Sequence, residues 1–327
     1  MQQERFTVAV WRYDRTQALY DGRVTLKDRE ITLIDAPLEE IFSRALGNAE
    51  FHVSELSFSN FLRLTVAGKC AYAGVPVFPS RSFRHGAFYV RKAANIRRPE
   101  DLVGKRVGVR EYSMTAALAA RGALRDQFGV RSDQIHWVMG DVDEKERDRI
   151  ELPTLYRPIS ITCAPDGALL SEMLVNGELD ALVAYKPIAP YKAGDARVAR
   201  LFQDPAEVEE RYFTDTRIFP IMHLVGVRRD VAEADPEVPM AVYRAFAEAQ
   251  GIADADLHLE QALKIGLPWL TRELKRTIEV MGENYWPSGF KANRAVVKRM
   301  IDWSFEDGLI PCRVEPEELF LGRLTET

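Results

Sequence analysis

Short apolar runs alternate with segments of helical spacing along the first half of the chain, which predicts an α/β fold. The runs have the length of strands and fall at 6–11, 30–34, 51–56, 106–110, 135–139 and 180–185. Apolar residues recur with helical spacing at 37–47, 57–67, 115–128 and 168–174. Polar side chains follow the strands, at the edge where an open α/β sheet binds ligands.

Two longer stretches, 76–90 and 216–227, differ from this alternation. The first has two prolines, then Arg81, Arg84 and His85, and then an apolar run, whereas the second is an apolar run that contains His223. We interpret both as strands that cross between two lobes. This predicts a discontinuous lobe of residues 1–88 and 222–327, and a second lobe of residues 89–221. Such a plan is that of a bilobed solute-binding fold, which closes on its ligand by hinge motion.

Composition and charge narrow the class of partner. The 327 residues suffice for two lobes, and a net charge of −5 gives no reason to expect nucleic acid or an anionic membrane. The three cysteines are far apart, and no apolar run approaches the ~20 residues of a membrane span. The start of the chain has no apolar leader segment. We therefore expect a cytoplasmic protein that binds a small molecule; a homo-oligomer is left open.

Metal and cofactor motifs are absent from the sequence. It contains no H-E-x-x-H, no close His/Cys pair, no glycine-rich phosphate loop and no dinucleotide fingerprint. We therefore predict no metal and no cofactor. A metal held by distant residues such as His85 and His223 stays an open alternative.

Several motifs together point to one family. The more specific are Arg81-Ser-Phe-Arg-His85, Ile218-Phe-Pro-Ile-Met-His223 and Asn284-Tyr-Trp-Pro287, and further ones are Tyr13-Asp-Arg-Thr16 and Glu55-Leu-Ser-Phe-Ser-Asn60. On these motifs, which span nearly the whole chain, it resembles the 4,5-dihydroxyphthalate decarboxylases. The resemblance implies a type II periplasmic-binding-protein-like fold, with two mixed-sheet lobes joined by two crossover strands. It also implies a carboxy-lyase that needs no cofactor.

The chain departs from the family pattern at Arg217, Lys186 and Ser288. These departures leave the exact aromatic acid open.

The implied reaction converts 4,5-dihydroxyphthalate to protocatechuate in the cleft between the lobes. It needs cations for two adjacent carboxylates, an acceptor for a phenolic proton, and an acid that protonates the ring carbon. We predict His85 and His223 as acids, although a histidine in an apolar run is more often a packed core residue. Glu111 is the candidate acceptor of the phenolic proton.

The predicted substrate-binding residues are cationic or lie at expected helix starts. They are Arg15, Ser59, Asn60, Arg81, Arg84, Tyr112, Ser113 and Thr115. Arginine suits a carboxylate because its planar fork donates two parallel hydrogen bonds. The alternatives are surface ion pairs for the arginines and simple helix capping for the hydroxyl and amide side chains.

Two other functions stay open on the same fold. One is a solute-binding protein that delivers an aromatic or other carboxylate to a transporter, which the missing leader segment disfavours. The other is a different enzyme, such as the type that makes the pyrimidine precursor of thiamin.

Overall fold

The computed structural model describes residues 6–26, 29–145 and 152–327. The chain divides into two compact units. Unit 1 comprises Met1–Arg81, Ile221–Lys298 and Val314–Thr327, and unit 2 comprises Ser82–Pro220 and Arg299–Arg313. Each unit is built around its own mixed sheet.

The sheet of unit 1 has the strand order β2-β1-β3-β11-β4. Its strands are β1 (Phe6–Ala9), β2 (Ile31–Ile34), β3 (Val53–Ser57), β4 (Tyr72–Arg81) and β11 (Ile221–Arg228). β1 runs parallel to β2 and β3, whereas β11 runs antiparallel to both β3 and β4. The antiparallel register places His223 opposite Ser57 on one side and Ser80 on the other.

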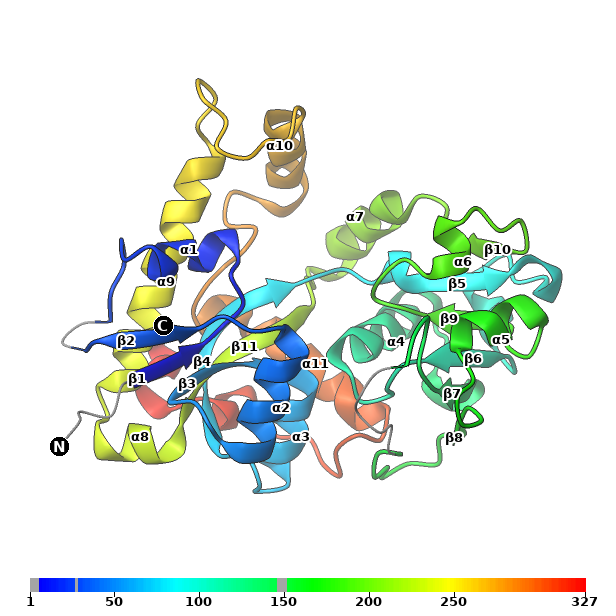
Figure 1. Cartoon of the computed structure of the whole chain (residues 1–327), viewed down its shortest axis with the longest axis horizontal. Coiled ribbons are helices and arrows are strands. Elements are labelled where there is room, and N and C mark those ends of the chain that lie inside the picture. Colours follow the sequence, from blue (N-terminus) through cyan, green and yellow to red (C-terminus); the bar gives the residue numbers. More distant parts are fainter. Residues whose placement is uncertain (1–5, 27–28, 146–151) are drawn as a thin grey trace. The chain divides into compact units, whose positions relative to one another are not determined.

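Helices cover both faces of this sheet (Figure 1). On one face, α1 (Asp14–Tyr20) and α9 (Val238–Leu257) share a hydrophobic core with the strands, to which Leu19 and Phe246 contribute. On the other face lie α2 (Leu38–Asn48) and α3 (Phe58–Val66). The remaining helices of unit 1 are α8 (Arg229–Ala234), α10 (Leu270–Met281) and the start of α11 (Arg294–Glu306).

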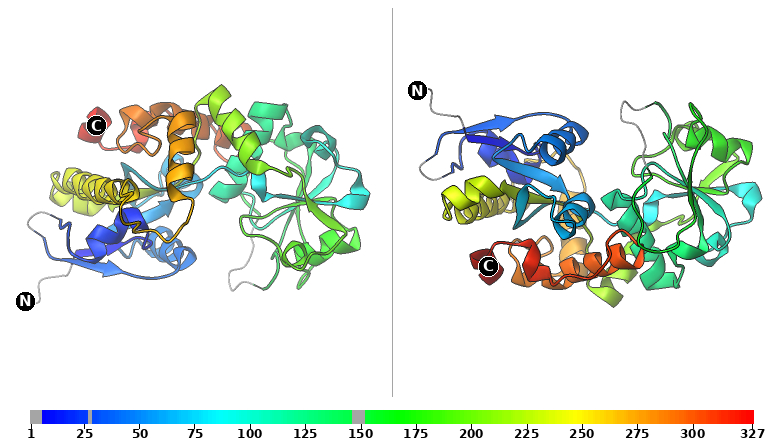
Figure 2. Two further views of the ribbon diagram at one scale, coloured as in Figure 1. Left: turned by 90° about the horizontal axis from the view of Figure 1, so that it is seen from above. Right: turned by 90° about the horizontal axis from the view of Figure 1, so that it is seen from below.

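The sheet of unit 2 has the order β10-β5-β9-β6-β7-β8. Its strands are β5 (Phe88–Arg91), β6 (Arg106–Val109), β7 (His136–Met139), β8 (Ile161–Cys163), β9 (Ala181–Val183) and β10 (Val198–Arg200). Its helices are α4 (Thr115–Phe128), α5 (Leu170–Asn176), α6 (Ala189–Lys192) and α7 (Pro205–Thr216), and Figure 2 shows helices on either side of this sheet.

The predicted α/β class with two mixed sheets is confirmed, and every strand predicted from an apolar run has an observed counterpart. Helix α7 was not predicted, because its charged sequence carries no clear apolar stripe. A local signal does exist, since Asp204 caps the helix by accepting from the backbone N–H groups of Ala206 and Glu207, and Pro205 follows it.

The unit boundaries differ from the predicted ones in three places. Residues 82–88 and 299–313 were assigned to the discontinuous lobe, but they belong to unit 2, and Ile221 was assigned to the second lobe but belongs to unit 1. His85 packs against Tyr212 of α7. The second segment is held by polar contacts to α4, which connect residues about 180 positions apart and therefore leave no local pattern in the sequence.

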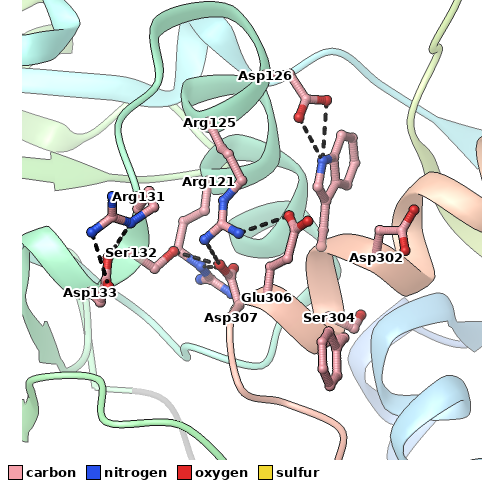
Figure 3. Close-up of polar contacts among 12 residues, drawn as sticks. Arg121, Arg125, Asp126, Arg131, Ser132, Asp133, Asp302, Ser304, Glu306 and Asp307 are labelled. Atoms are coloured by element: carbon pink, nitrogen blue, oxygen red, sulfur yellow. Dashed lines mark hydrogen bonds and ion pairs between the residues drawn. The ribbon is translucent and has the colours of Figure 1, made fainter. Parts of the chain in front are cut away.

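Two carboxylates, the buried Asp307 and the partly buried Asp126, hold residues 299–313 against α4 within unit 2 (Figure 3). Asp307 accepts from Arg121 Nε at 2.6 Å and from Ser132 Oγ at 2.6 Å. Asp126 pairs with Arg299 and accepts from the indole N–H of Trp303 at 3.2 Å. Removing one partner of a buried ion pair strongly destabilises the folded state, because the remaining charge stays buried without a partner.

Gly122 lets α4 approach the ring of Trp303 closely. A Cβ atom at this position would lie 2.3 Å from two ring atoms of Trp303, which is far inside van der Waals contact. The glycine is thus explained by packing rather than by backbone conformation.

Within the described residues, no helix combines the length and the apolar character that crossing a membrane requires.

We expect Gly122→Ala to lower the free energy of unfolding by about 1–3 kcal/mol, because the added methyl group overpacks the α4–Trp303 contact. Urea unfolding followed by circular dichroism measures this change. Gly251→Ala in α9 is the matched control, since no atom lies within 4 Å of its added Cβ. That variant should be about 0.5–1 kcal/mol more stable than the wild type. Equal unfolding curves for the two variants would contradict the packing argument.

Candidate functional site

The side chain of Glu55 is fully buried in β3 of unit 1, and three groups of the described residues donate to its carboxylate. Oε2 accepts from the backbone N–H of Trp11 at 2.9 Å. Oε1 lies 2.8 Å from the hydroxyl of Tyr13 and 2.6 Å from Nδ1 of His223. A buried carboxylate is stable only when its oxygens are satisfied in this way.

His223 uses one of its two ring nitrogens in this cluster. The side chain projects from β11, is 16% exposed, and packs edge-on against the ring of Phe42 at a centroid distance of 4.8 Å. Among the described residues, its polar contacts with Glu55 and Tyr13 both use Nδ1. The contact with a carboxylate fixes Nδ1 as the protonated nitrogen, so that Nε2 is the one that can exchange a proton with a ligand.

Tyr13 is held in place by the turn that starts α1. Its backbone N–H donates to Thr16 Oγ1 at 2.9 Å, and that hydroxyl donates to Trp11 O at 2.8 Å. Burial and the neighbouring Glu55 carboxylate raise the pKa of Tyr13 well above its usual value. The phenol therefore stays protonated and acts as a donor to Glu55.

Arg15 lies on the same turn as Tyr13. Its guanidinium stacks over the ring of Tyr13 at 4.0 Å and over that of Trp286 at 4.5 Å. Nε donates to the carbonyl of Pro79, and Nη1 pairs with Asp14 at 2.8 Å. Two aromatic faces and a backbone carbonyl thus hold a partly exposed cation in one orientation, as carboxylate recognition requires.

Arg81 has structural partners in unit 1. Its guanidinium donates to the side chain of Asn293 and to the carbonyl of Pro287, and burial lowers the pKa of Arg81 to about 9. These contacts hold the 284–289 loop beside β4. Arg81 is therefore placed to support that loop, and its role in binding a carboxylate stays a prediction.

Ser59 and Asn60 lie in the first turn of α3, directly after β3. Ser59 is buried, and Asn60 accepts a hydrogen bond from Arg63 at 3.1 Å. The helix begins at Phe58 with Ser57 as its N-cap residue, so neither Ser59 nor Asn60 is the cap itself.

His85 lies in unit 2 and has very different surroundings from His223. The ring is 2% exposed and packs against Phe202 and Tyr212. Nε2 lies 3.0 Å from Gln127 Oε1, and Nδ1 is 3.9 Å from Glu209. Burial lowers the pKa of His85 to about 4. These contacts are those of a neutral packed histidine, and its predicted role as an acid stays untested.

Apart from Arg84, the remaining predicted residues of unit 2 lie directly before α4 or at its start. Tyr112 is fully buried, with its ring under the guanidinium of Arg121 at 3.8 Å, and is explained by packing. Ser113 and Thr115 are buried, and Ser113 donates to the carboxylate of Glu111. Burial also lowers the pKa of Arg84.

Unit 1 thus brings together two of the predicted residues, Arg15 and His223, through Tyr13. The sequence analysis gave no role to Tyr13, Glu55 or Trp286. Glu55 carried a signal, because it is a charged residue inside an apolar strand, and such a residue needs a buried partner. Among the described residues, no group of three or more His, Cys, Asp or Glu side chains is arranged to hold a metal ion.

Two curated proteins are similar to this chain along its sequence. The 4,5-dihydroxyphthalate decarboxylase of Comamonas testosteroni is 36% identical over 322 residues, which cover 98% of this chain and 97% of that protein. The 4,5-dihydroxyphthalate decarboxylase of Pseudomonas putida is 36% identical over 205 residues, which cover 63% of this chain and 80% of that protein. A scan against models of protein families gave no match.

Solved structures share the fold at low sequence identity. The periplasmic aliphatic sulphonate binding protein SsuA of Escherichia coli has a TM-score of 0.55 and 15% identity, with all of both chains covered. The desulfurization enzyme DSZB has a TM-score of 0.53 and 11% identity, with 99% of this chain and 98% of that chain covered. The predicted periplasmic-binding-protein-like fold is confirmed.

The surroundings of His85 predict a pH-dependent part of the stability. Its pKa is lowered from 6.5 to about 4, so the unfolded chain binds a proton that the folded chain excludes between these values. This contribution is complete above about pH 6.5 and is lost as the pH falls towards 4, by about 2 kcal/mol between pH 7 and pH 5. His85→Gln should lose that much less than the wild type over the same interval, measured by urea unfolding at each pH.

His136→Gln is the control, because His136 is exposed. It should keep the pH dependence of the wild type. The same slope in all three proteins would contradict the buried neutral state of His85.

Proposed function

This chain belongs to the 4,5-dihydroxyphthalate decarboxylase family, and we propose that it removes one carboxylate from 4,5-dihydroxyphthalate to give protocatechuate. One observation in this structure supports the same activity for this chain. It is the pairing of a partly exposed histidine with a fully buried carboxylate at 2.6 Å, beside an oriented arginine on the same unit.

The reaction is a replacement of CO2 by a proton at one ring carbon. The hydroxyl para to that carbon gives up its proton and pushes an electron pair into the ring. The ring carbon takes a proton, the bond to the carboxylate then breaks, and its electron pair restores the aromatic ring as CO2 leaves. The hydroxyl regains a proton, so one proton is consumed for each CO2 released.

His223 is suited to deliver the proton to the ring carbon. Nδ1 bonds Glu55, so Nε2 is the nitrogen of this partly exposed ring that can exchange a proton with a ligand. When the ring is protonated, the buried carboxylate of Glu55 balances its charge and holds its orientation. A general acid of this kind contributes roughly 10²–10⁴-fold to the rate.

Arg15 is suited to bind one of the two adjacent carboxylates. Stacking on Tyr13 and Trp286 fixes the plane of its guanidinium, while Nε is already occupied by Pro79 O. The terminal nitrogens of the guanidinium are therefore held in one orientation. One of them, Nη1, pairs with Asp14, whose side chain is half-exposed.

The other predicted residues keep their proposed roles as hypotheses. Glu111 would accept the phenolic proton, Arg81 and Arg84 would bind the second carboxylate, and His85 would act as a second acid. Ser59, Asn60, Tyr112, Ser113 and Thr115 would bind substrate oxygens. We further propose a cytoplasmic location, which suits three cysteines that are all free.

The first test of this function is turnover. Incubation of the protein with 4,5-dihydroxyphthalate should release CO2 and form protocatechuate, which chromatography detects. His223→Gln should lower kcat by about 10²–10⁴-fold, because the proton donor is removed. His136→Gln, which changes an exposed histidine, should keep the wild-type rate. Tight binding of the diacid without product would favour a solute-binding protein instead.

The second test concerns Arg15. Arg15→Met should raise KM by about 10–100-fold, as expected when a hydrogen bond between charged groups is lost, with a smaller effect on kcat. Arg12→Met is the matched control, because Arg12 is exposed and bonds Gln17 at 2.9 Å on the same segment. An unchanged KM in Arg15→Met would remove Arg15 from the substrate site.

A further inference from the structure

The hydroxyl of Tyr13 and the ring of His223 donate to the same acceptor, one carboxylate oxygen of Glu55. Both contact Oε1 of Glu55, the hydroxyl at 2.8 Å and Nδ1 at 2.6 Å, and they lie 3.5 Å from each other. The second oxygen of Glu55 is occupied by the N–H of Trp11. Since Glu55 is fully buried, Oε1 accepts hydrogen bonds from these two donors and none from bulk water.

We propose that Tyr13 is a positioning residue that sets how strongly Glu55 holds the proton-donating ring of His223. This inference deepens the proposed function and rests on it. Each donor on Oε1 weakens the bond of the other, because a carboxylate oxygen that already accepts a hydrogen bond is a poorer acceptor for the next. The phenol thus weakens the hold of Glu55 on the Nδ1–H group of His223.

The neighbours of this cluster support the assignment to Tyr13. Among the described residues, the charged or titratable side chains near it are Glu55 from β3, Tyr13 with Arg15 from the start of α1, and Tyr20 from the end of α1, which interacts with Glu55 through its charge but is not bonded to Oε1. From β4, Ser80 contributes a hydroxyl that bonds Tyr13, and from α2 the apolar ring of Phe42 closes one side of His223. Of the groups around Oε1, Tyr13 has a hydroxyl that can be removed with little change in shape.

The test is a nuclear magnetic resonance titration of the histidine ring protons in the full chain without substrate, with the His223 signal assigned from His223→Gln. In Tyr13→Phe, the midpoint of His223 should rise by about half a unit to one unit, because Glu55 then interacts with the imidazolium alone. In Glu55→Gln, the midpoint should fall by about one unit or more, because the balancing charge is lost.

Tyr20→Phe is the matched control. Tyr20 lies on the same helix and is partly buried, and its hydroxyl donates to the carbonyl of Val10 at 2.6 Å, away from Oε1. That variant should keep the wild-type midpoint of His223. No shift or a downward shift in Tyr13→Phe, or an equal shift in Tyr20→Phe, overturns the inference.

Kinetics separate this inference from the proposed function. If the protein turns over 4,5-dihydroxyphthalate, the alkaline limb of the kcat profile should move upward in Tyr13→Phe by the same half unit to one unit (about 3–10-fold in proton concentration). Turnover without any shift in either measurement refutes the role of Tyr13 alone. A shifted midpoint in a protein without turnover keeps the coupling of Tyr13 to His223 and refutes the proposed function.

Discussion

A carboxylate without access to water is the constraint around which unit 1 is organised. The three donors to Glu55 come from the segment after β1, from the start of α1 and from β11, which lies 168 residues away along the chain. Each donor must be in place for the charge to be stable, because an unsatisfied buried carboxylate costs several kcal/mol. The same requirement agrees with the observed register of β11 beside β3 and holds the ring of His223 in one orientation. Folding and function therefore depend on the same three hydrogen bonds.

The sequence was sufficient for the fold class and insufficient for the site. Most strand and helix positions follow from local periodicity and could be predicted, whereas α7 was missed because its charged sequence carries no clear apolar stripe. The stretch 81–85 was predicted to bind and protonate the substrate because it contains two arginines and a histidine within five residues. In the structure, however, Arg81 bonds Asn293 and Pro287, and His85 packs among aromatic rings. Glu55 has no charged neighbour in the sequence, and its partners lie 42 and 168 residues away, at distances where no spacing rule applies.

The two histidines show how surroundings decide the chemistry of one side chain. His85 has a neutral amide at Nε2 and aromatic rings around it, and burial favours its uncharged form. His223 has a carboxylate at Nδ1 and one partly exposed edge. A buried neutral ring contributes packing and a pH-dependent stability, whereas a ring held by a carboxylate can carry a proton to a ligand. Both histidines lie in motifs that are specific to the family, so the motifs alone do not tell which histidine acts as the acid.

The fold itself leaves the choice between binding and catalysis open, because it is shared by a sulphonate-binding protein and by a desulfurization enzyme. Binding an organic anion requires cations and hydrogen-bond donors in fixed positions, which Arg15 between two aromatic rings supplies. Protonating a ring carbon requires in addition a donor whose charge is balanced in both protonation states. A buried Glu55 with Tyr13 on its shared oxygen meets that second requirement, which binding alone does not impose. The carboxylate bonded to His223 is therefore the feature that favours catalysis over binding alone.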